Sequence, residues 1–299
     1  MQETEGLPSD NNHDPSNVIY HDGKYYLWYT QHRNDRPYDH FADCYVSCSV
    51  SEDGKKWNYL GKALIPSKEG WDCKGVLTAN VIKHEGKFYM FYTGVGESFA
   101  KGETRKRCCG LAVAEKPEEM FIRVGENPVF MWDAPGTWDD QSADDISVLF
   151  WKGRWRLYYK GTNEREDDPD QYMLGMAYSN NITGPYVRYE GNPIIKGHAF
   201  SIWPYKSGLC LLTGLKHDIG RVYGSDWNDM TGIQYLYYSE DGIRFEPCFE
   251  CPNRASGIYI PTDDKLKLDI TNYWGISVST KDTFKKRFLY RFGFIKSDK

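Results

Sequence analysis

One short pattern recurs along this chain and limits the folds open to it more than any other feature. Residues Val18–Thr30 read VIYHDGKYYLWYT, which is an apolar run, a tight turn and a run rich in aromatic residues. Such a segment is typical of two antiparallel strands joined by a hairpin. Similar segments are VIKHEGKFYMFYT (Val81–Thr93), VLFWKGRWRLYYK (Val148–Lys160) and a fainter copy, WPYKSGLCLLTG, from Trp203. The turn glycines lie 63, 67 and 55 residues apart, at Gly23, Gly86, Gly153 and Gly208, so the chain is built from repeated units.

A second pair of strands follows each hairpin. Its turn is clearest in SEDGKKW (Ser51–Trp57) and SEDGIRF (Ser239–Phe245). A fifth unit fits the end of the chain, with SGIYIP from Ser256 as its inner strand and YWGISVS from Tyr273 further out. Five four-stranded units in 299 residues predict an all-β, five-bladed β-propeller that forms a single domain over residues 1–299. A β-sandwich is the alternative, but a sandwich does not require a fixed period.

Composition agrees with a strand-rich chain and excludes several other classes. The 10 Trp, 23 Tyr and 14 Phe residues make up 16% of the sequence, more than a helical bundle needs. The net charge of −5 argues against a nucleic-acid partner. Because the chain has neither a long apolar run nor a leader-like N-terminal pattern, we expect a soluble protein, cytoplasmic or periplasmic, and no membrane partner. The oligomeric state stays open.

Eight cysteines are present, and we expect free thiols because a chain of this size has an ample core without disulfide bridges. Cys248 and Cys251 form a CxxC pair. Neither a second such pair nor a suitably spaced histidine pair accompanies it, so the motif does not predict structural zinc.

The repeat also indicates where a site would form, since the inner strands of a propeller line its axial funnel. Counting back nine residues from each turn glycine reaches, in blade order, Asp14, Leu77, Asp144 and Ala199. Two carboxylates thus occupy one predicted position. His198, which precedes Ala199, stands where His13 stands in the first blade.

These residue types suit the hydrolysis of a glycosidic bond, in which one group activates water and another protonates the departing oxygen. Our hypothesis is that Asp14 activates water, His198 protonates the oxygen, and Asp144 orients the sugar and tunes the acid. Imidazole titrates near neutral pH and suits the role of acid. The residues expected to bind the substrate are His13, Thr78, Gln141, Asp145 and Trp203, with Trp71 and Trp138 as further stacking candidates.

A metal ion is not required by this hypothesis. Asp14, Asp144 and His198 would be able to hold a divalent cation near the funnel axis, directly or through water. The chain contains no contiguous ligand motif such as HExxH. We therefore predict no catalytic metal and no cofactor.

Over nearly its whole length the chain resembles glycoside hydrolase family 117, the α-1,3-(3,6-anhydro)-L-galactosidases that act on neoagaro-oligosaccharides. The motifs that carry the resemblance are HDPSNVIYHDGKYYLWYT, DDISVLFWKGRWRLYYKGT, GHAFSIWPYKSG, YSEDGIRFEP, ASGIYIP and YWGISVS. The resemblance implies an inverting, exo-acting hydrolase of algal oligosaccharides with Asp14 as general base, Asp144 as second essential aspartate and His198 as general acid. The family carries a glutamate directly after that histidine, where this chain has Ala199.

Two alternatives remain open. The first two motifs also suit the wider five-bladed group that includes the arabinosidases and xylosidases of family 43, although these require a glutamate from the fourth blade. Alternatively, the chain is a carbohydrate-binding propeller with impaired catalysis, which Ala199 favours.

Overall fold

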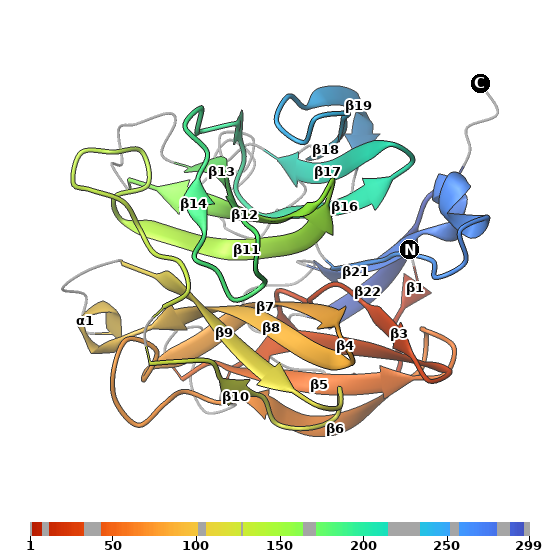
Figure 1. Ribbon diagram of the computed structural model, residues 1–299. Coiled ribbons are helices and arrows are strands. Elements are labelled where there is room, and N and C mark those ends of the chain that lie inside the picture. Colours follow the sequence, from red (N-terminus) through yellow and green to blue (C-terminus); the bar gives the residue numbers. More distant parts are fainter. Residues whose placement is uncertain are drawn as a thin grey trace, which may run out of the picture.

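Five antiparallel sheets follow one another around a central axis in the computed structural model of the protein (Figure 1). The structure describes residues 2–7, 12–32, 43–100, 106–126, 128–163, 172–214, 234–251, 257–279 and 288–295. Within these ranges the helical elements are α1 (Glu97–Ala100) and two short 3₁₀ turns, Leu266–Leu268 and Ile270–Asn272. The prediction of an all-β, five-bladed propeller is confirmed.

Each blade contains a chain of four paired strands. The first blade contains β2 (Asn12–His13), β3 (Ile19–His21), β4 (Lys24–Gln31), β5 (Tyr45–Ser51) and β6 (Trp57–Leu64). The second contains β7 (Gly75–His84), β8 (Lys87–Val95), β9 (Cys108–Ala114) and β10 (Ile122–Arg123). The third contains β11 (Ser142–Trp151), β12 (Arg154–Thr162), β13 (Tyr172–Ser179), β14 (Val187–Arg188) and β15 (Ile195–Lys196). The fourth contains β16 (Phe200–Tyr205), β17 (Gly208–Gly214), β18 (Gln234–Ser239) and β19 (Glu246–Cys251).

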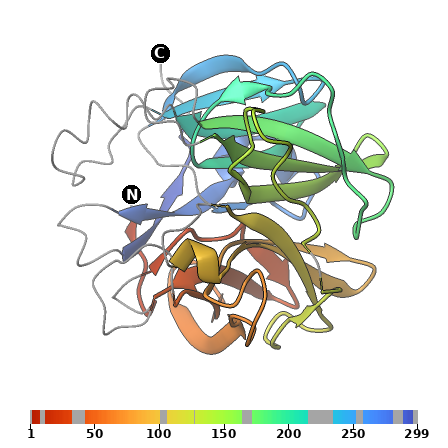
Figure 2. The same ribbon diagram turned by 90° about the vertical axis from the view of Figure 1, so that its left-hand side faces the viewer.

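The fifth blade closes the ring by joining the two ends of the chain. It contains β20 (Gly257–Tyr259), β21 (Trp274–Ser279), β22 (Phe288–Gly293) and the N-terminal strand β1 (Gln2–Glu3). β1 pairs with β22 in antiparallel register, so the first strand of the chain lies beside the last (Figures 1 and 2). The predicted inner and outer strands of this unit are β20 and β21; Ser256 itself lies outside the described residues.

Local sequence explains the inner hairpins. The residue before each of the first three turn glycines adopts a left-handed conformation, with φ of +47° at Asp22, +48° at Glu85 and +46° at Lys152. With the following glycine also at positive φ, this is the conformation that matches the twist of a hairpin. In the fourth hairpin Lys206 takes this place and Gly208 already begins β17, so Gly208 lies one residue beyond the turn.

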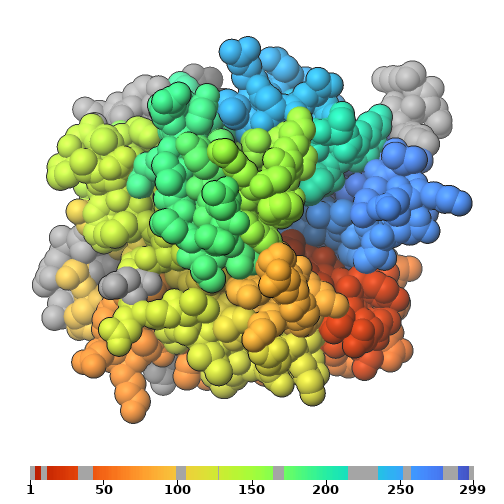
Figure 3. All heavy atoms as spheres, viewed as in Figure 1, coloured from red at the N-terminus to blue at the C-terminus, as the bar shows by residue number. Residues whose placement is uncertain are grey.

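The aromatic residues fill the spaces between neighbouring blades. Trp28 of the first blade packs with Phe88 and Met90 of the second, all fully buried. Leu27 and Tyr29, on the opposite face of the same strand, pack against Ile276 of the fifth blade. Neighbouring sheets are accordingly in close contact on the face shown in Figure 3. Side chains along β4 point alternately to the interface with the second blade and to the interface with the fifth. Both faces of the strand are therefore apolar.

Two other expectations concern the chain as a whole. All eight cysteines are free, as predicted. In the part of the chain that the structure describes, no helix has both the length and the hydropathy needed to cross a bilayer.

Candidate active site

Three residues with left-handed backbone conformation mark the same position in three consecutive blades. Asp14, Thr78 and Asp145 have φ of +46°, +50° and +49°. Such values are uncommon for residues other than glycine and cluster at functional sites. The backbone N–H of Thr78 donates to Oγ1 of Thr30 at 3.0 Å, and that of Asp145 donates to Oγ1 of Thr93 at 3.3 Å. Each bond joins the left-handed residue to the preceding blade.

Strand register defines which residues are equivalent. His13 lies opposite Thr30, Leu77 opposite Thr93, and Asp144 opposite Lys160. The first residue of each pair directly precedes the left-handed residue of its blade. His13, Leu77 and Asp144 therefore share one position, and the next residue of each blade, Asp14, Thr78 and Asp145, shares another.

This register corrects the predicted equivalence of Asp14 and Asp144. Eight positions separate His13 from His21 at the end of the first hairpin, whereas seven separate Asp144 from Trp151. The first blade thus carries one extra residue between its bulge and its turn. A constant count from the turn glycine is therefore off by one residue in the second and third blades.

The fourth blade agrees with the sequence-based alignment. The backbone N–H of His198 donates to the carbonyl of Gly214 at 3.1 Å. Gly214 stands as far from the hairpin turn as Thr30 does in the first blade. His198 therefore takes the place of His13, and Ala199 takes the place of Asp14, as predicted.

Asp144 is held in a buried ion pair, with 3% of its side chain exposed. One of its oxygens contacts Nε of Arg107, and the other lies 3.3 Å from Nζ of Lys160. Two cations compensate the buried charge, as burial of a carboxylate requires. Its carboxylate is covered by these partners, and the expectation that Asp144 orients the sugar stays a prediction.

Asp145 is the third-blade carboxylate at the position of Asp14, and 19% of its side chain is exposed. Oδ2 of Asp145 lies 2.5 Å from Nζ of Lys160. Burial raises the pKa of Asp145; Lys160 opposes the shift, and the carboxylates of Asp144 and Asp14 add to it. The charge of Asp14 therefore contributes to the raised pKa of Asp145, although 131 residues separate the two in the sequence.

Lys160 sits between two carboxylates. Burial alone lowers the pKa of its ammonium, but Asp144 and Asp145 outweigh burial and hold the pKa above its usual range. The side chain is therefore a fixed positive charge at the inner end of the third blade. The repeat carries a signal for it: the third copy ends in Lys160 where the first two end in Thr30 and Thr93. Sequence reasoning did not use this difference.

Asp14 lies at the end of β2 with 24% of its side chain exposed. Its Oδ2 is 2.5 Å from Nδ1 of His13, and Nε2 of His13 is 2.5 Å from Nε2 of His32. His13 is buried beneath these two partners. The ring of His13 contacts the carboxylate of Asp14, and the expectation that His13 binds substrate stays a prediction.

His198 is half-buried two residues before β16, and its ring lies 4.8 Å from the ring of Tyr172 at the start of β13. The ring of Tyr172 also lies 5.9 Å from Nζ of Lys160. Tyr172 therefore connects the histidine of the fourth blade with the charged groups of the third. Tyr172 and Arg107 are further site residues that sequence reasoning missed, since neither belongs to a repeated motif.

The predicted sugar-binding residues separate into two groups. Thr78 is nearly buried and its Oγ1 lies 2.5 Å from Oγ1 of Thr93, while Gln141 is half-buried beside the first residue of β11. Both lie at the inner strands, and their contact with substrate stays a prediction. Trp203 is 1% exposed and packs in the core between the fourth and fifth blades. Trp203 therefore serves packing in this structure, and its contact with a sugar stays a prediction.

Trp71 and Trp138 also serve packing. They stack on Tyr92 and Tyr159 at centroid distances of 5.7 and 5.6 Å. Each ring lies over a glycine of the neighbouring strand, Gly94 or Gly161, so closely that a Cβ atom would meet it at 2.1 or 2.2 Å. Both tryptophans therefore belong to the blade structure.

This packing predicts the effect of Gly161→Ala. The added methyl group has no space beside the ring of Trp138, and we expect a loss of about 1–3 kcal/mol in the free energy of unfolding, which is the usual cost of overpacking. Urea denaturation measures it. Gly293→Ala is the matched control, because its Cβ would meet only the carbonyl of Tyr273 at 3.8 Å. Equal stability of the two variants would contradict the packing role.

Comparisons with known proteins assign the chain to a family. The model of the glycosyl hydrolases family 32 N-terminal domain matches residues 8–164, just over half of the chain. The chain belongs to glycosyl hydrolase family 32. This family is one of glycosyl hydrolases, the class of enzyme predicted from the site residues, and the chain has a β-propeller fold.

Relatives of this family 32 chain include two probable sucrose-6-phosphate hydrolases. That of Vibrio cholerae is 27% identical over 233 residues, which are 77% of this chain and 36% of the relative. That of Psychromonas ingrahamii is 33% identical over 156 residues, which are 52% of this chain and 26% of the relative. The chain thus spans about a third or less of the length of these relatives.

Solved structures with the same fold include members of other glycoside hydrolase families. Zg3597, a family 117 glycoside hydrolase from Zobellia galactanivorans, matches with a TM-score of 0.76 and 22% identity, over 97% of this chain and 88% of that one. CoXyl43, a family 43 β-xylosidase/α-arabinofuranosidase from a compost metagenome, matches with a TM-score of 0.69 and 13% identity, over 100% and 95%. At these identities the likeness shows a shared fold. The resemblance to family 117 is thus matched in fold, while the sequence family is family 32.

Proposed function

We propose that this family 32 chain is an inverting, exo-acting glycosidase of oligosaccharides in which Asp14 activates water and His198 protonates the departing oxygen. The observation that carries the proposal is that Asp14 and Asp145 occupy one position in two blades, each with left-handed backbone and a partly exposed carboxylate. Two carboxylates are the usual means of dividing the work of glycosidic bond cleavage.

Asp14 suits the role of general base. It is partly exposed, and His13 holds one of its oxygens in place. A fixed carboxylate needs little reorganisation when it accepts a proton. The left-handed backbone at Asp14 is the local strain that a preorganised catalytic group often carries.

His198 suits the role of general acid because no carboxylate stands at the aligned place of the fourth blade, where the chain has Ala199. Its ring is half-buried against Tyr172, and Nζ of Lys160 lies 5.9 Å from the ring of that tyrosine. We assign the role first given to Asp144 to Asp145, which has the exposure that Asp144 lacks. Asp144 and Lys160 are then positioning residues that hold Asp145.

For the substrate we propose neoagaro-oligosaccharides or related algal oligosaccharides, with release of the terminal sugar. This rests on the family 117 motifs and on a histidine in place of a fourth-blade carboxylate. A second candidate is a β-fructoside such as sucrose 6-phosphate, which the 27% identity to the probable sucrose-6-phosphate hydrolase of Vibrio cholerae favours. Family 43-like arabinosides and xylosides are the third class to test.

A substrate panel tests the proposal. It contains neoagaro-, carrageenan-, arabinan- and xylan-derived oligosaccharides, sucrose and sucrose 6-phosphate, with the released anomer followed by NMR. We expect release of a terminal sugar from a neoagaro-oligosaccharide, with inverted configuration at first detection. Cleavage of the fructosides alone would support the second candidate, and retained configuration would exclude direct attack by water. Binding without release at high protein concentration would identify a carbohydrate-binding propeller.

A further inference from the structure

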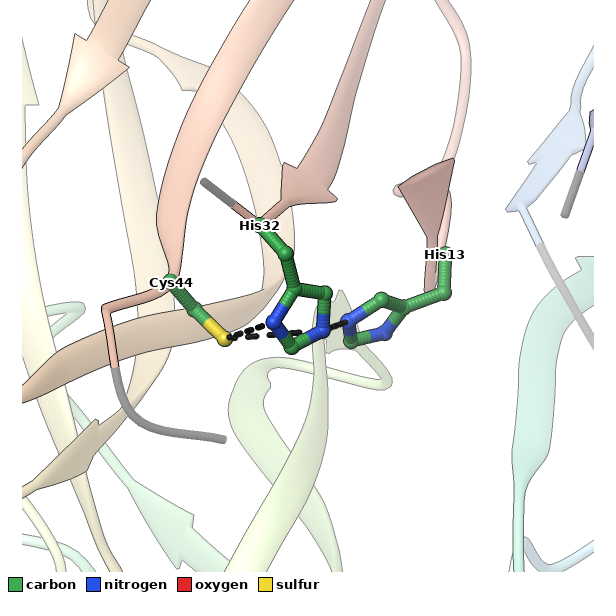
Figure 4. A group of neighbouring side chains, drawn as sticks. All are labelled: His13, His32 and Cys44. Carbon is green, nitrogen blue, oxygen red and sulfur yellow. Dashed lines mark hydrogen bonds between the residues drawn. The ribbon is translucent and has the colours of Figure 1, made fainter. Parts of the chain in front are cut away.

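Two histidines and a cysteine converge in the first blade beside Asp14. His13 ends β2, His32 directly follows β4, and Cys44 directly precedes β5, so three separate segments supply them (Figure 4). All three side chains are buried, and one ligand atom from each lies within 4.8 Å of the others. Within the described residues, this is the group of histidine, cysteine and carboxylate side chains whose spacing suits a metal ion. Of the residues first considered for a cation, Asp14, Asp144 and His198, it contains none.

The atoms of this group face one another. Nε2 of His13 lies 2.5 Å from Nε2 of His32. Sγ of Cys44 lies 3.2 Å from Nδ1 and 3.7 Å from Nε2 of the same His32 ring. Figure 4 shows the sulfur and the ring of His13 on opposite sides of His32. Two Nε2 atoms at this distance share a proton. A zinc ion bound by both nitrogens would take the place of that proton and move them to about 3.3 Å apart, the spacing of two ligands on a tetrahedral ion.

The donor set selects the metal. Two imidazole nitrogens and one sulfur suit zinc, which binds nitrogen at about 2.0–2.1 Å and thiolate at about 2.3 Å. Calcium and magnesium require oxygen ligands instead. Leu77 and Val95 of the second blade form an apolar cluster with Cys44. These side chains offer no oxygen ligands, so they disfavour a cation that keeps its hydration shell. Three protein ligands leave a fourth position open on zinc.

An ion bound to His13 would also affect Asp14, because the two side chains are in contact. Nδ1 of His13 lies 2.5 Å from Oδ2 of Asp14. A histidine that binds metal through one nitrogen commonly donates its other N–H to a carboxylate, and this arrangement fixes the tautomer and the ring. With zinc on Nε2, the proton of His13 must be on Nδ1, and His13 must donate to Asp14.

We propose that His13, His32 and Cys44 bind one Zn²⁺ ion, and that this ion positions Asp14 through His13. The positioning part rests on the proposed function, whereas the zinc site does not. Loss of the metal frees the tautomer of His13. In the tautomer that carries its proton on Nε2, Nδ1 is an acceptor and repels the carboxylate of Asp14. His13 is then a positioning residue whose effect depends on the ion.

Metal binding itself is tested without activity. The purified full chain, loaded with Zn²⁺ and dialysed, is analysed for metal content, and the chelated chain is loaded with Co²⁺ for absorption spectroscopy. We expect one zinc ion per chain and a Co²⁺–thiolate charge-transfer band that added Zn²⁺ removes. Cys44→Ser should lose this band. Cys48→Ser is the control, because Cys48 is also buried in the first blade but lies outside the group.

Absence of zinc and of the charge-transfer band in the wild-type chain would overturn the site and leave a shared proton between His13 and His32. Wild-type protein therefore decides the matter even if Cys44→Ser does not fold. Persistence of the band in a folded Cys44→Ser variant would also overturn it.

Coupling to Asp14 needs a second measurement. With a substrate identified, removal of zinc should lower kcat roughly tenfold or more with little change in KM, and Zn²⁺ should restore it. Unchanged kcat in the zinc-free chain would overturn the positioning role while the zinc site stands. Failure of the proposed function gives a different result, namely zinc binding together with Asp14→Asn turnover equal to that of the wild type.

Discussion

Asp14→Asn is expected to lower kcat by a factor of about 10²–10⁴, the usual contribution of a general base, on whichever oligosaccharide the wild type hydrolyses. An amide cannot accept the proton of the attacking water, yet it has nearly the same shape as the carboxylate. Asparagine also tolerates the left-handed backbone at this position better than most residues. We therefore expect a folded variant whose substrate affinity is close to that of the wild type.

Two measurements separate loss of chemistry from loss of structure. Calorimetric binding of the substrate to the variant should give a dissociation constant near the wild-type value, and thermal unfolding should show an intact propeller. Asp22→Asn is the matched control. It also changes a left-handed aspartate to asparagine in the first blade, but at an exposed hairpin turn. Wild-type turnover by Asp14→Asn would remove Asp14 from the mechanism.

Lys160→Met is expected to cost about 3–5 kcal/mol in the free energy of unfolding, because removing one partner of a buried ion pair leaves uncompensated charge. Lys160 contacts both Asp144 and Asp145, and Arg107 alone cannot balance the two carboxylates. Methionine has nearly the length of the lysine stem, so packing changes little. Urea denaturation at neutral pH measures the loss.

A double variant tests the charge explanation. Lys160→Met combined with Asp145→Asn removes one positive and one negative charge, and it should recover a large part of the stability lost in the single variant. Lys87→Met is the control, because Lys87 pairs with Glu115 on the surface and such pairs contribute little. If the double variant were no more stable than Lys160→Met, packing of the lysine stem would account for the loss.

The positions of the two carboxylates illustrate where sequence reasoning stops. Asp14 and His198 were found from the repeat, and the register of the first and fourth blades agrees with their assignment. Asp144 was chosen over its neighbour Asp145 because a count from the turn assumes bulges of equal length. One extra residue in the first blade breaks that assumption. At this bulge an offset of one residue replaces a partly exposed carboxylate by a buried one, although both contact Lys160.

Burial was the second property that the chain order did not reveal. Trp203 and His13 belong to motifs beside the site, but both are covered by groups from other segments. The same holds for His32 and Cys44, which are twelve residues apart and meet His13 only because β2, β4 and β5 are neighbours in one sheet. Such contacts depend on which strand lies next to which.

The sequence by itself determined the architecture and the number of blades. These follow from local signals, namely turn residues, alternation and a repeat near sixty residues, and local signals are readable in one dimension. Only the tertiary structure decided which aspartate of the third blade is equivalent to Asp14, that Lys160 balances the buried charge, and that His13, His32 and Cys44 meet. Burial and charge compensation arise between segments that are distant in the chain, so they can be assigned only from the folded structure.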